Sequence, residues 1–447
     1  MRNYQCIELK FNIPFNDEIS FHSHLYLEDN KIEIRVLLKD NENFSRKYMM
    51  WFGNQNDSEI ISNYVTAKTF KNDKELIDIS LSNSKVLSLV SEQYDEIGQL
   101  YFTIVIDKII LYKKAVEIEK EYAKIYLNQD GFDLVKSFYS LFTSFGNDGN
   151  VDIGRMKGMS NFYKLGKSKF RPEFEFNVSD RKDDRSPKIE KIPILKFYYE
   201  SDATDEDIIL YFSIACKICS FYLGNNIEFD RAVICRDNYR IILRNTLETK
   251  FTLNVSSLNW LLKVRGIEGF LKLNWEKKFL SNRDKLSEAI TNYTHARLLD
   301  TNSRFMLLFS VIEICMGRNK LVAKKFELAV TAKQKKELYK SAFELIRKTI
   351  HKKDYKDFEK KWNVAQQKLL FKPMKSPLEK FLKSNKINTE ILEISLDDMM
   401  QIRNNIIHGS VDPEMTEMIK KANVELFRIT PILILNALGI KQWQQKT

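Results

Sequence analysis

The spacing of apolar residues changes partway along the chain, and this change constrains the fold more than any other feature. Up to about residue 280, apolar and polar residues mostly alternate, as in strands with one buried face. From about residue 282 onward, apolar residues recur every three or four positions, as on one side of a helix. The sequence therefore predicts an α+β protein, with a β-rich region at 1–280 and an all-α helical bundle at 281–447.

Three strand pairs are expected in the first region. Alternation runs on both sides of Asp29-Asn30 in HLYLEDNKIEIRVLL and of Asp237-Asn238 in IEFDRAVICRDNYRIILRN. A third pair is expected around Asp130-Gly131 in YAKIYLNQDGFDLV. Each of these turn dipeptides is typical of a tight connection between strands.

One helix and one linker complete the prediction for this region. The helix is TDEDIILYFSIACKICSFYLG, which begins at Thr204 with Asp207 in capping-box position and ends at Gly224. The polar run VSDRKDDRSPKIEK, residues 178–191, is predicted to be a linker that divides the region into two subdomains.

The second region contains segments of helical period, and Gly317, Gly409 and Gly439 each follow such a segment. LLFKPMKSPLEK is expected to be a loop among these helices. The predicted helices are NRDKLSEAITNYTHARLL, NSRFMLLFSVIEICMG, a lysine-rich stretch from Lys324 to Trp362, SLDDMMQIRNNIIHG and PEMTEMIKKANVELFRITPILILNALG.

Basic residues are concentrated in the helical region. Residues 1–280 hold 40 Lys and Arg against 41 Asp and Glu, whereas residues 281–447 hold 31 against 19. This asymmetry favours an acidic partner such as RNA or DNA for the second region, with the lysines between 324 and 361 as the expected contact surface for a phosphate backbone. A lysine-rich solvated surface is the alternative.

Cysteine usage and hydropathy indicate the compartment. The five cysteines are odd in number and sparse, which suits a reducing environment better than a disulfide framework. No segment approaches the roughly 18 to 20 apolar residues that span a bilayer, and the first residues lack a signal-peptide apolar run. We expect a soluble cytoplasmic protein with no membrane partner.

Several short motifs do not support a function. The GKS at 166–168 lacks the glycine that a P-loop requires five residues earlier, where Asn161 stands. The Cys216/Cys219 pair has no second pair at zinc spacing and lies in an apolar helix, so buried thiols are predicted. His22 and His24 would share one strand face without a further ligand nearby in the sequence, which favours an exposed strand face over a metal site.

The segment SLDDMMQIRNNIIHGS, residues 395–410, is the exception. Ser395 and Asp398 form the pattern of a capping box, and Gly409 is placed to end the helix. An apolar stripe is formed by Leu396, Met399, Ile402 and Ile406 and widened by Met400 and Ile407.

Arg403, Asn404 and His408 are the polar residues of this helix that require an explanation. Asn404 and His408 lie four residues apart, opposite the stripe, whereas Arg403 falls within the apolar arc, where a guanidinium is costly unless paired or interfacial. Arginine neutralises phosphate oxygens, and histidine titrates near neutrality as a general acid or base. This set can bind a phosphodiester and move a proton without a metal.

The residues RNNIIH, followed by Gly409, resemble the Arg, four to six residues, His signature of HEPN domains, in the RNxxxHG form of the Apea-like group. NSRFMLLFSVIEICMG resembles an earlier HEPN helix with an acidic residue, Glu313, facing the site. The basic residue that some of these proteins carry four positions after the acid is absent, because Gly317 stands there and Arg318 follows. HLYLEDNKIEIRVLL resembles the N-terminal domain of Apea-like proteins.

The resemblance implies a metal-independent, cofactor-free endoribonuclease that uses the ribose 2′-hydroxyl as nucleophile and works as a homodimer with facing motif helices. His408 would be the acid or base, Arg403 would stabilise phosphorane charge, and Asn404 would orient the phosphate or the histidine. The implied role is anti-phage defence or abortive infection, with RNA, such as tRNA, as substrate and a phage or cellular trigger sensed by the N-terminal region. The alternatives are a non-catalytic RNA-binding or protein-interaction module, or a structural Arg403–Glu313 ion pair.

Overall fold

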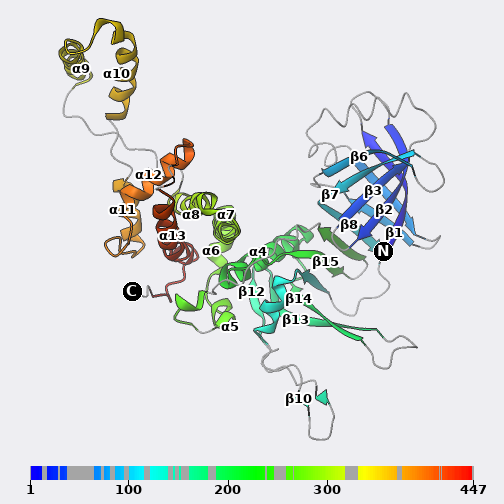
Figure 1. Ribbon diagram of the computed structural model, residues 1–447. Coiled ribbons are helices and arrows are strands. Elements are labelled where there is room, and N and C mark those ends of the chain that lie inside the picture. The colour runs from blue at the N-terminus through cyan, green and yellow to red at the C-terminus, as the bar shows by residue number, and fades with distance from the viewer. Residues whose placement is uncertain are drawn as a thin grey trace. The chain divides into compact units, whose positions relative to one another are not determined.

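The chain forms two compact units, a β-rich unit at Met1–Ser281 and a helical unit at Asn282–Thr447, so the boundary lies one residue from the position expected from the sequence. Figure 1 shows both units in the computed structural model. The structure describes residues 2–12, 18–28, 31–37, 65–71, 75–80, 86–94, 100–114, 121–138, 144–145, 151–152, 161–179, 188–236, 239–245, 258–264, 266–317, 331–369, 375–411, 413 and 415–444.

Most of the described strands of the first unit join one mixed-order antiparallel sheet. Its strand order is β12-β13-β14-β9-β15-β16-β8-β5-β4-β1-β2-β3-β7-β6, while β10 (Ser144–Phe145) pairs separately with β11 (Val151–Asp152). The strands are β1 (Arg2–Asn12), β2 (Glu18–Glu28), β3 (Lys31–Leu37), β4 (Val65–Lys71), β5 (Glu75–Ser80), β6 (Val86–Tyr94), β7 (Leu100–Ile106), β8 (Lys108–Lys114), β9 (Tyr122–Leu127), β12 (Tyr163–Leu165), β13 (Ser168–Ser179), β14 (Lys188–Tyr199), β15 (Phe229–Arg236) and β16 (Tyr239–Asn245).

Two of the three predicted strand pairs are confirmed. Strands β2 and β3 pair from Glu28↔Lys31 outward, and β15 and β16 pair from Arg236↔Tyr239 outward. The third prediction is wrong, because the Asp130-Gly131 dipeptide opens helix α3 (Asp130–Lys136). The apolar residues after this dipeptide follow a helical spacing, and acidic residues occupy the first turn, where the helix dipole favours them.

The predicted linker at 178–191 is also corrected. Strands β13 and β14 pair continuously from Ser168↔Tyr199 to Ser179↔Lys188, so this polar run joins two strands of one hairpin and does not separate subdomains.

The GKS sequence is part of another hairpin. Gly166 and Lys167 form the turn between β12 and β13, Gly166 has a φ of 61°, and Lys167 Nζ pairs with Asp202 at 2.7 Å.

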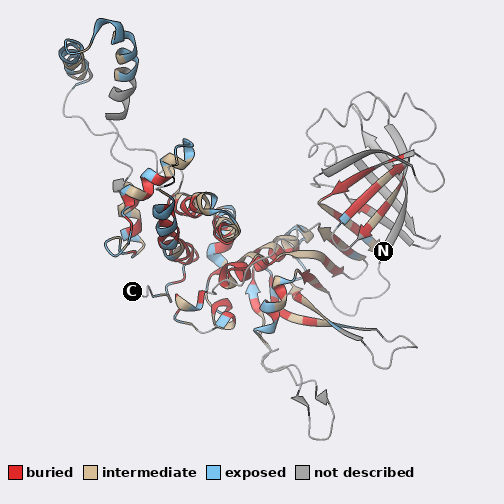
Figure 2. Cartoon of the chain, viewed as in Figure 1, coloured by how far each residue is buried: buried red, intermediate tan, exposed pale blue. Residues whose placement is uncertain are grey.

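Helix α4 (Asp205–Leu223) packs on one face of the sheet and is buried along much of its length (Figure 2). It begins with the predicted capping box, in which Thr204 and Asp207 exchange hydrogen bonds, and it ends at Gly224 with a φ of 77°. Phe197 of β14 meets Phe212 of α4 with ring centroids 4.9 Å apart. The burial of these large rings makes this face of the sheet the core of its part of the unit.

Shorter elements complete the described part of the first unit after the sheet. They are the 3-10 helix η1 (Leu258–Trp260), α5 (Gly266–Leu271) and α6 (Glu276–Ser281). Phe270 of α5, Trp275 and Phe279 of α6 are almost fully buried. They therefore extend the apolar core beyond α4.

Helices form the described part of the second unit, as the spacing of its apolar residues predicts. They are α7 (Arg283–His295), η2 (Ala296–Leu298), α8 (Thr301–Met316), α9 (Ala332–Arg347), η4 (Lys352–Asp354), α10 (Tyr355–Leu369), α11 (Lys375–Ser384), α12 (Leu396–Ile407) and α13 (Met415–Ala437). The core lies among α7, α8, α12 and α13. The expected loop LLFKPMKSPLEK is partly wrong, because α11 begins inside it and Pro377 occupies the first turn, where its missing N–H costs nothing.

Helices α9 and α10 lie side by side as a hairpin (Figure 1). Three rings join them: Phe343 of α9 contacts Phe358 and Trp362 of α10 with centroid distances of 5.6 and 6.1 Å. Within residues 331–362, no described side chain is buried, and Leu338 and Leu345 are 61% and 66% exposed. A small aromatic contact therefore holds this hairpin together.

Candidate functional site

Helix α12 begins and ends where its sequence predicts. The hydroxyl of Ser395 accepts a hydrogen bond from the backbone N–H of Asp398 at 3.1 Å and donates to the Asp398 carboxylate at 2.7 Å. The carboxylate thus bonds the cap hydroxyl and not the Ser395 N–H that a full capping box would use. At the other end, Gly409 adopts a φ of 67°, and Ser410 N–H donates to the carbonyl of Asn405 at 2.9 Å. This closing geometry favours glycine.

The apolar stripe of α12 packs inward over its first turns. Leu396, Met399, Met400 and Ile402 are buried. At the last turn, Ile406 is only partly buried and Ile407 is 51% exposed. The helix therefore extends beyond its packing partners at the end that carries the polar residues.

Arg403 is paired with the acidic residue of the preceding core helix. Its Nε donates to Oε1 of Glu313 at 3.0 Å, and its Nη2 lies 2.9 Å from the same oxygen. Both side chains are 23% exposed, and the guanidinium lies 5.9 Å from the ring centroid of Phe309 on α8. This pairing explains how an arginine is tolerated in the apolar arc, and the contact with Phe309 was not foreseen from the sequence.

Asn404 and His408 lie on the exposed side of the same helix end. Both side chains are exposed, and none of the described residues hydrogen-bonds to either of them. His408 is the C-cap residue, and its backbone N–H donates to the carbonyl of Asn404 at 3.0 Å. The structure thus joins Arg403 to Glu313 and leaves the amide and the imidazole open to a ligand.

This arrangement combines an anchored cation with an accessible proton carrier. A guanidinium has five N–H donors, and both observed contacts of Arg403 go to one oxygen, so its remaining donors can meet a phosphate. An exposed imidazole can act as a general acid or base. These are the components that phosphodiester cleavage through a 2′-hydroxyl requires.

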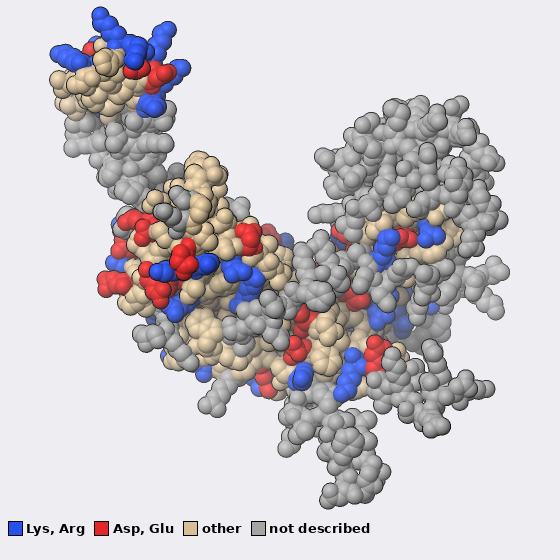
Figure 3. All heavy atoms as spheres, in the orientation of Figure 1, with Lys and Arg blue, Asp and Glu red and all other residues tan. Residues whose placement is uncertain are grey.

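The α9–α10 hairpin is the most basic described part of the helical unit. Residues 331–363 contain 11 Lys and Arg against 5 Asp and Glu. Figure 3 shows Lys and Arg side chains projecting from this hairpin. The lysines predicted to contact phosphates therefore lie on an exposed pair of helices, except for those at 324 and 325, which fall outside the described residues.

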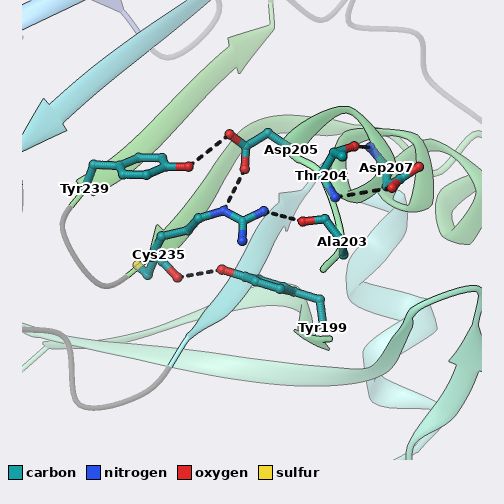
Figure 4. A network of polar contacts seen from close by, with 8 residues as sticks. Tyr199, Ala203, Thr204, Asp205, Asp207, Cys235 and Tyr239 are labelled. Carbon is teal, nitrogen blue, oxygen red and sulfur yellow. Dashed lines mark hydrogen bonds and ion pairs between the residues drawn. The ribbon is translucent and has the colours of Figure 1, made fainter. Parts of the chain in front are cut away.

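A second polar cluster lies in the first unit, between the start of α4 and the β15–β16 hairpin (Figure 4). Arg236 donates from Nε to Asp205 at 2.9 Å and from Nη2 to the carbonyl of Ala203 at 2.5 Å. Tyr239 donates to the other Asp205 oxygen at 3.3 Å, and Tyr199 donates to the carbonyl of Cys235 at 2.6 Å. The hydrogen-bonding groups of this cluster pair with one another. They therefore fasten the start of α4 to the sheet.

Among the remaining candidates, the predicted buried thiols are confirmed, whereas the strand face predicted to be exposed at His22 and His24 is described only at His24, which is half-buried. Cys216 and Cys219 are buried free thiols in α4, and burial raises the pKa of both. His24 stacks on Tyr26 with centroids 6.3 Å apart, whereas the side chain of His22 falls outside the described residues. In the described part of the chain, no group of three or more His, Cys, Asp or Glu side chains is arranged to hold a metal ion.

Comparison with protein-family models, curated proteins and solved structures finds no match for the chain. Among the helices described, none is both long enough and apolar enough to cross a membrane. The chemistry of the site therefore has to be argued from its own residues.

Proposed function

We propose that the helical unit is a metal-independent endoribonuclease of the HEPN type, with Arg403 and His408 at its centre. The observation that carries this proposal is the end of α12, where the guanidinium held by Glu313 shares one helix end with the exposed His408. The RNxxxHG motif supplies the family assignment, and the basic α9–α10 hairpin supports RNA as the substrate.

In the proposed reaction, the ribose 2′-oxygen bonds to the adjacent phosphorus and the bond from phosphorus to the 5′-oxygen breaks. The 2′-hydroxyl loses a proton and the departing 5′-oxygen gains one. His408 serves one of these transfers as general base or acid, and water serves the other. Arg403 neutralises charge on the phosphorane through donors that Glu313 does not use, and Asn404 orients the phosphate.

We further assign a homodimer in which the ends of two α12 helices face each other. Exposed apolar side chains on α12 and α13 support the assignment, since Ile407 is 51% exposed and Met418 and Val424 of α13 are 37% and 51% exposed. The solution mass tests it, because a fully active protein that is strictly monomeric would rule it out. The β-rich unit would restrain the nuclease until a phage or cellular trigger arrives, in a cytoplasmic defence or abortive-infection role.

The decisive experiment is cleavage of total cellular RNA, and of tRNA alone, by purified wild-type, Arg403→Ala and His408→Ala proteins with EDTA present. We expect discrete cleavage by the wild type and a fall of about 10² to 10⁴-fold in rate for His408→Ala, the usual contribution of a general acid or base. Lys136→Ala, an exposed change on α3 of the other unit, is the matched control and should cleave normally.

The second candidate is a module that binds RNA or protein without cutting it. The Arg403–Glu313 pair favours this candidate. An arginine in a packed apolar arc needs a counter-charge, so the pair can be explained by a structural role alone. In a binder, His408→Ala should leave RNA affinity nearly unchanged, since a neutral imidazole adds little to phosphate binding. Wild-type RNA binding without cleavage, unaltered in His408→Ala, would therefore decide for the module.

The contribution of the α9–α10 hairpin is tested separately. Replacing Lys340 or Lys356 with Gln should weaken binding for every RNA sequence and reduce the slope of log affinity against log salt by about 0.7 for each phosphate that is no longer neutralised. Both lysines are exposed, so the fold should be unaffected. An unaltered salt slope in both variants would move the phosphate-binding surface elsewhere.

A further inference from the structure

Helices α3 and α4 pack on one face of the sheet at β13 and β14, where Phe132 of α3 meets Phe174 and Phe212 of α4 meets Phe197. Phe170 and Phe197 point toward α4, where they are fully buried. Side chains alternate along a strand, so the neighbours of these residues on β13 and β14 point to the opposite face. The strand register brings Arg171 beside Lys196 and Lys169 beside Tyr198 on that face.

Three aromatic rings and three cations interleave there, and we call them the cation–aromatic face. They are Tyr122, Phe162, Tyr198, Lys169, Arg171 and Lys196. The Phe162 ring lies 5.2 Å from Lys169 Nζ and 4.8 Å from Arg171 Cζ, and its centroid is 5.4 Å from that of Tyr198. Lys196 Nζ lies 5.5 Å from the centroids of both Tyr122 and Tyr198. The three rings and Lys196 are partly exposed, so ligands can reach them.

The charges of this face are only partly neutralised. Arg171 pairs with Glu173 at 3.1 Å, but Lys169 and Lys196 have no carboxylate partner among the described residues. Lys124, the cross-strand partner of Lys196 on β9, is neutralised by Glu175 at 2.7 Å. Two ammonium groups held over rings without a counter-charge favour an anionic ligand with flat groups.

A cavity continues from this face. Phe162 also lines a hollow of about 490 Å³, whose wall carries Lys164 and Lys277 against the single carboxylate of Glu276. Lys272 lines it too but is paired with Glu268 at 2.9 Å. The volume lies in the range of small-ligand sites and accommodates one nucleotide, and its basic wall suits a phosphate.

We propose that the cation–aromatic face binds single-stranded RNA, with unpaired bases stacked on its rings, phosphates beside Lys169 and Lys196, and one nucleotide in the adjoining cavity. Stacking on aromatic side chains combined with a basic track is the general mode by which proteins hold single strands. Rings and cations together select such a strand over a folded acidic protein, which offers charge without stacking groups. The choice of RNA over DNA rests on the proposed function, whereas the surface is argued from its own residues.

The test uses full-length protein carrying His408→Ala, so that bound RNA is not cut, and measures fluorescence anisotropy with a labelled single-stranded RNA of mixed sequence. We expect Tyr198→Ala to weaken binding by roughly tenfold to a hundredfold, the usual effect of removing one stacked base. Lys196→Gln should weaken it severalfold and lower the salt slope by about 0.7. Lys136→Gln, on the helix side of the sheet, is the matched control and should bind normally.

Each outcome bears on the proposal separately from nuclease activity. Circular dichroism checks that each variant is folded. If Tyr198→Ala unfolds, Lys196→Gln still tests the proposal, because it removes a charge and leaves a polar side chain of similar size. Unchanged affinity in folded Lys196→Gln and Tyr198→Ala proteins would overturn the proposal. Tighter binding of duplex RNA, tighter binding of single-stranded DNA, or binding to phosphatidylserine vesicles in place of RNA would also overturn it. If the wild type cleaves RNA but the Tyr198 and Lys196 changes do not alter binding, the nuclease assignment stands and the proposed binding face does not.

Discussion

Two arginines, one in each unit, bridge segments far apart in the sequence, and they differ in how many acceptors they reach and in what surrounds them. Arg236 reaches Asp205 and the carbonyl of Ala203 through different nitrogens, and its side chain is 13% exposed. Arg403 directs two nitrogens to one oxygen of Glu313 and is 23% exposed. Asp205 also accepts from Tyr239, whereas Glu313 has no second donor among the described residues.

The difference separates an arginine that holds the fold from one that can also serve a ligand. Around Arg236, the two contacts go to a carboxylate and a backbone carbonyl, and Tyr239 shares the carboxylate, so these groups hold α4 against the sheet. At Arg403, a single carboxylate oxygen takes both contacts, and exposed Asn404 and His408 lie at the same helix end. An ion pair beside an accessible imidazole is therefore the better place for chemistry.

The largest expected effect is on local stability. Arg236→Met should lower the free energy of local unfolding by about 2 kcal/mol, because it leaves one oxygen of Asp205 and the Ala203 carbonyl without a donor. Arg403→Met should cost only about 1 kcal/mol, because Arg403 is more exposed than Arg236 and its removal leaves one acceptor group unpaired instead of two. Amide hydrogen exchange in α4 and in α12 measures the two separately. Equal losses would remove the distinction between the two sites.

A smaller effect is expected when Glu313 alone is changed. Glu313→Gln keeps an oxygen that can accept from Arg403, so stability should fall by about 0.5 to 1 kcal/mol and RNA cleavage should stay within roughly threefold of wild type. Glu313→Ala removes the acceptor and should reduce the cleavage rate by roughly tenfold or more. Single-turnover cleavage assays compare the two variants. Equal rates in both would show that Glu313 does not position Arg403.

The smallest effect concerns the pH dependence of the Arg236 cluster. Burial, followed by the charge of Glu121, raises the pKa of Tyr199 above its ordinary value of 10.0, and Arg236 opposes this. A raised pKa in the folded state means that the stabilisation is complete below about pH 10 and is lost as the pH rises toward the folded pKa.

Tyr199→Phe should therefore cost about 1 kcal/mol at neutral pH, because the hydrogen bond to Cys235 is removed, and should flatten the decline of stability above about pH 10. Urea denaturation between about pH 9 and about pH 11 measures this slope. Tyr26→Phe, on β2, is a control tyrosine change. An identical slope in Tyr199→Phe and wild type would contradict the assignment.

Much of the fold follows from local patterns in the sequence. The hairpins at β2–β3 and β15–β16 combine strict alternation with a turn dipeptide, and α4 combines a capping box with a terminal glycine, so several signals agree. The strand pair predicted at Asp130-Gly131 was wrong because a turn dipeptide can also begin a helix. The linker predicted at 178–191 was wrong because a polar run suits the end of a long hairpin as well as a linker.

The site was predictable only along its own helix. The helical spacing placed Arg403 in the apolar arc, and the resemblance to HEPN helices implied that Glu313 faces the site. The structure pairs the two side chains across 90 positions of sequence. The exposure of Ile407 could not be predicted, because it depends on where the neighbouring helices stop. The cation–aromatic face was not foreseen, because its rings and cations meet only through the register of β13 with β14.

The self-contained packing of the α9–α10 hairpin has an evolutionary consequence. The two helices are held together by the rings of Phe343, Phe358 and Trp362. No described side chain at 331–362 is buried. Substitutions, insertions or changes of charge there need no compensating change in the core of the bundle. Selection on this segment would therefore come mainly from whatever it contacts, and it could diverge among relatives faster than the helices that carry Arg403 and Glu313.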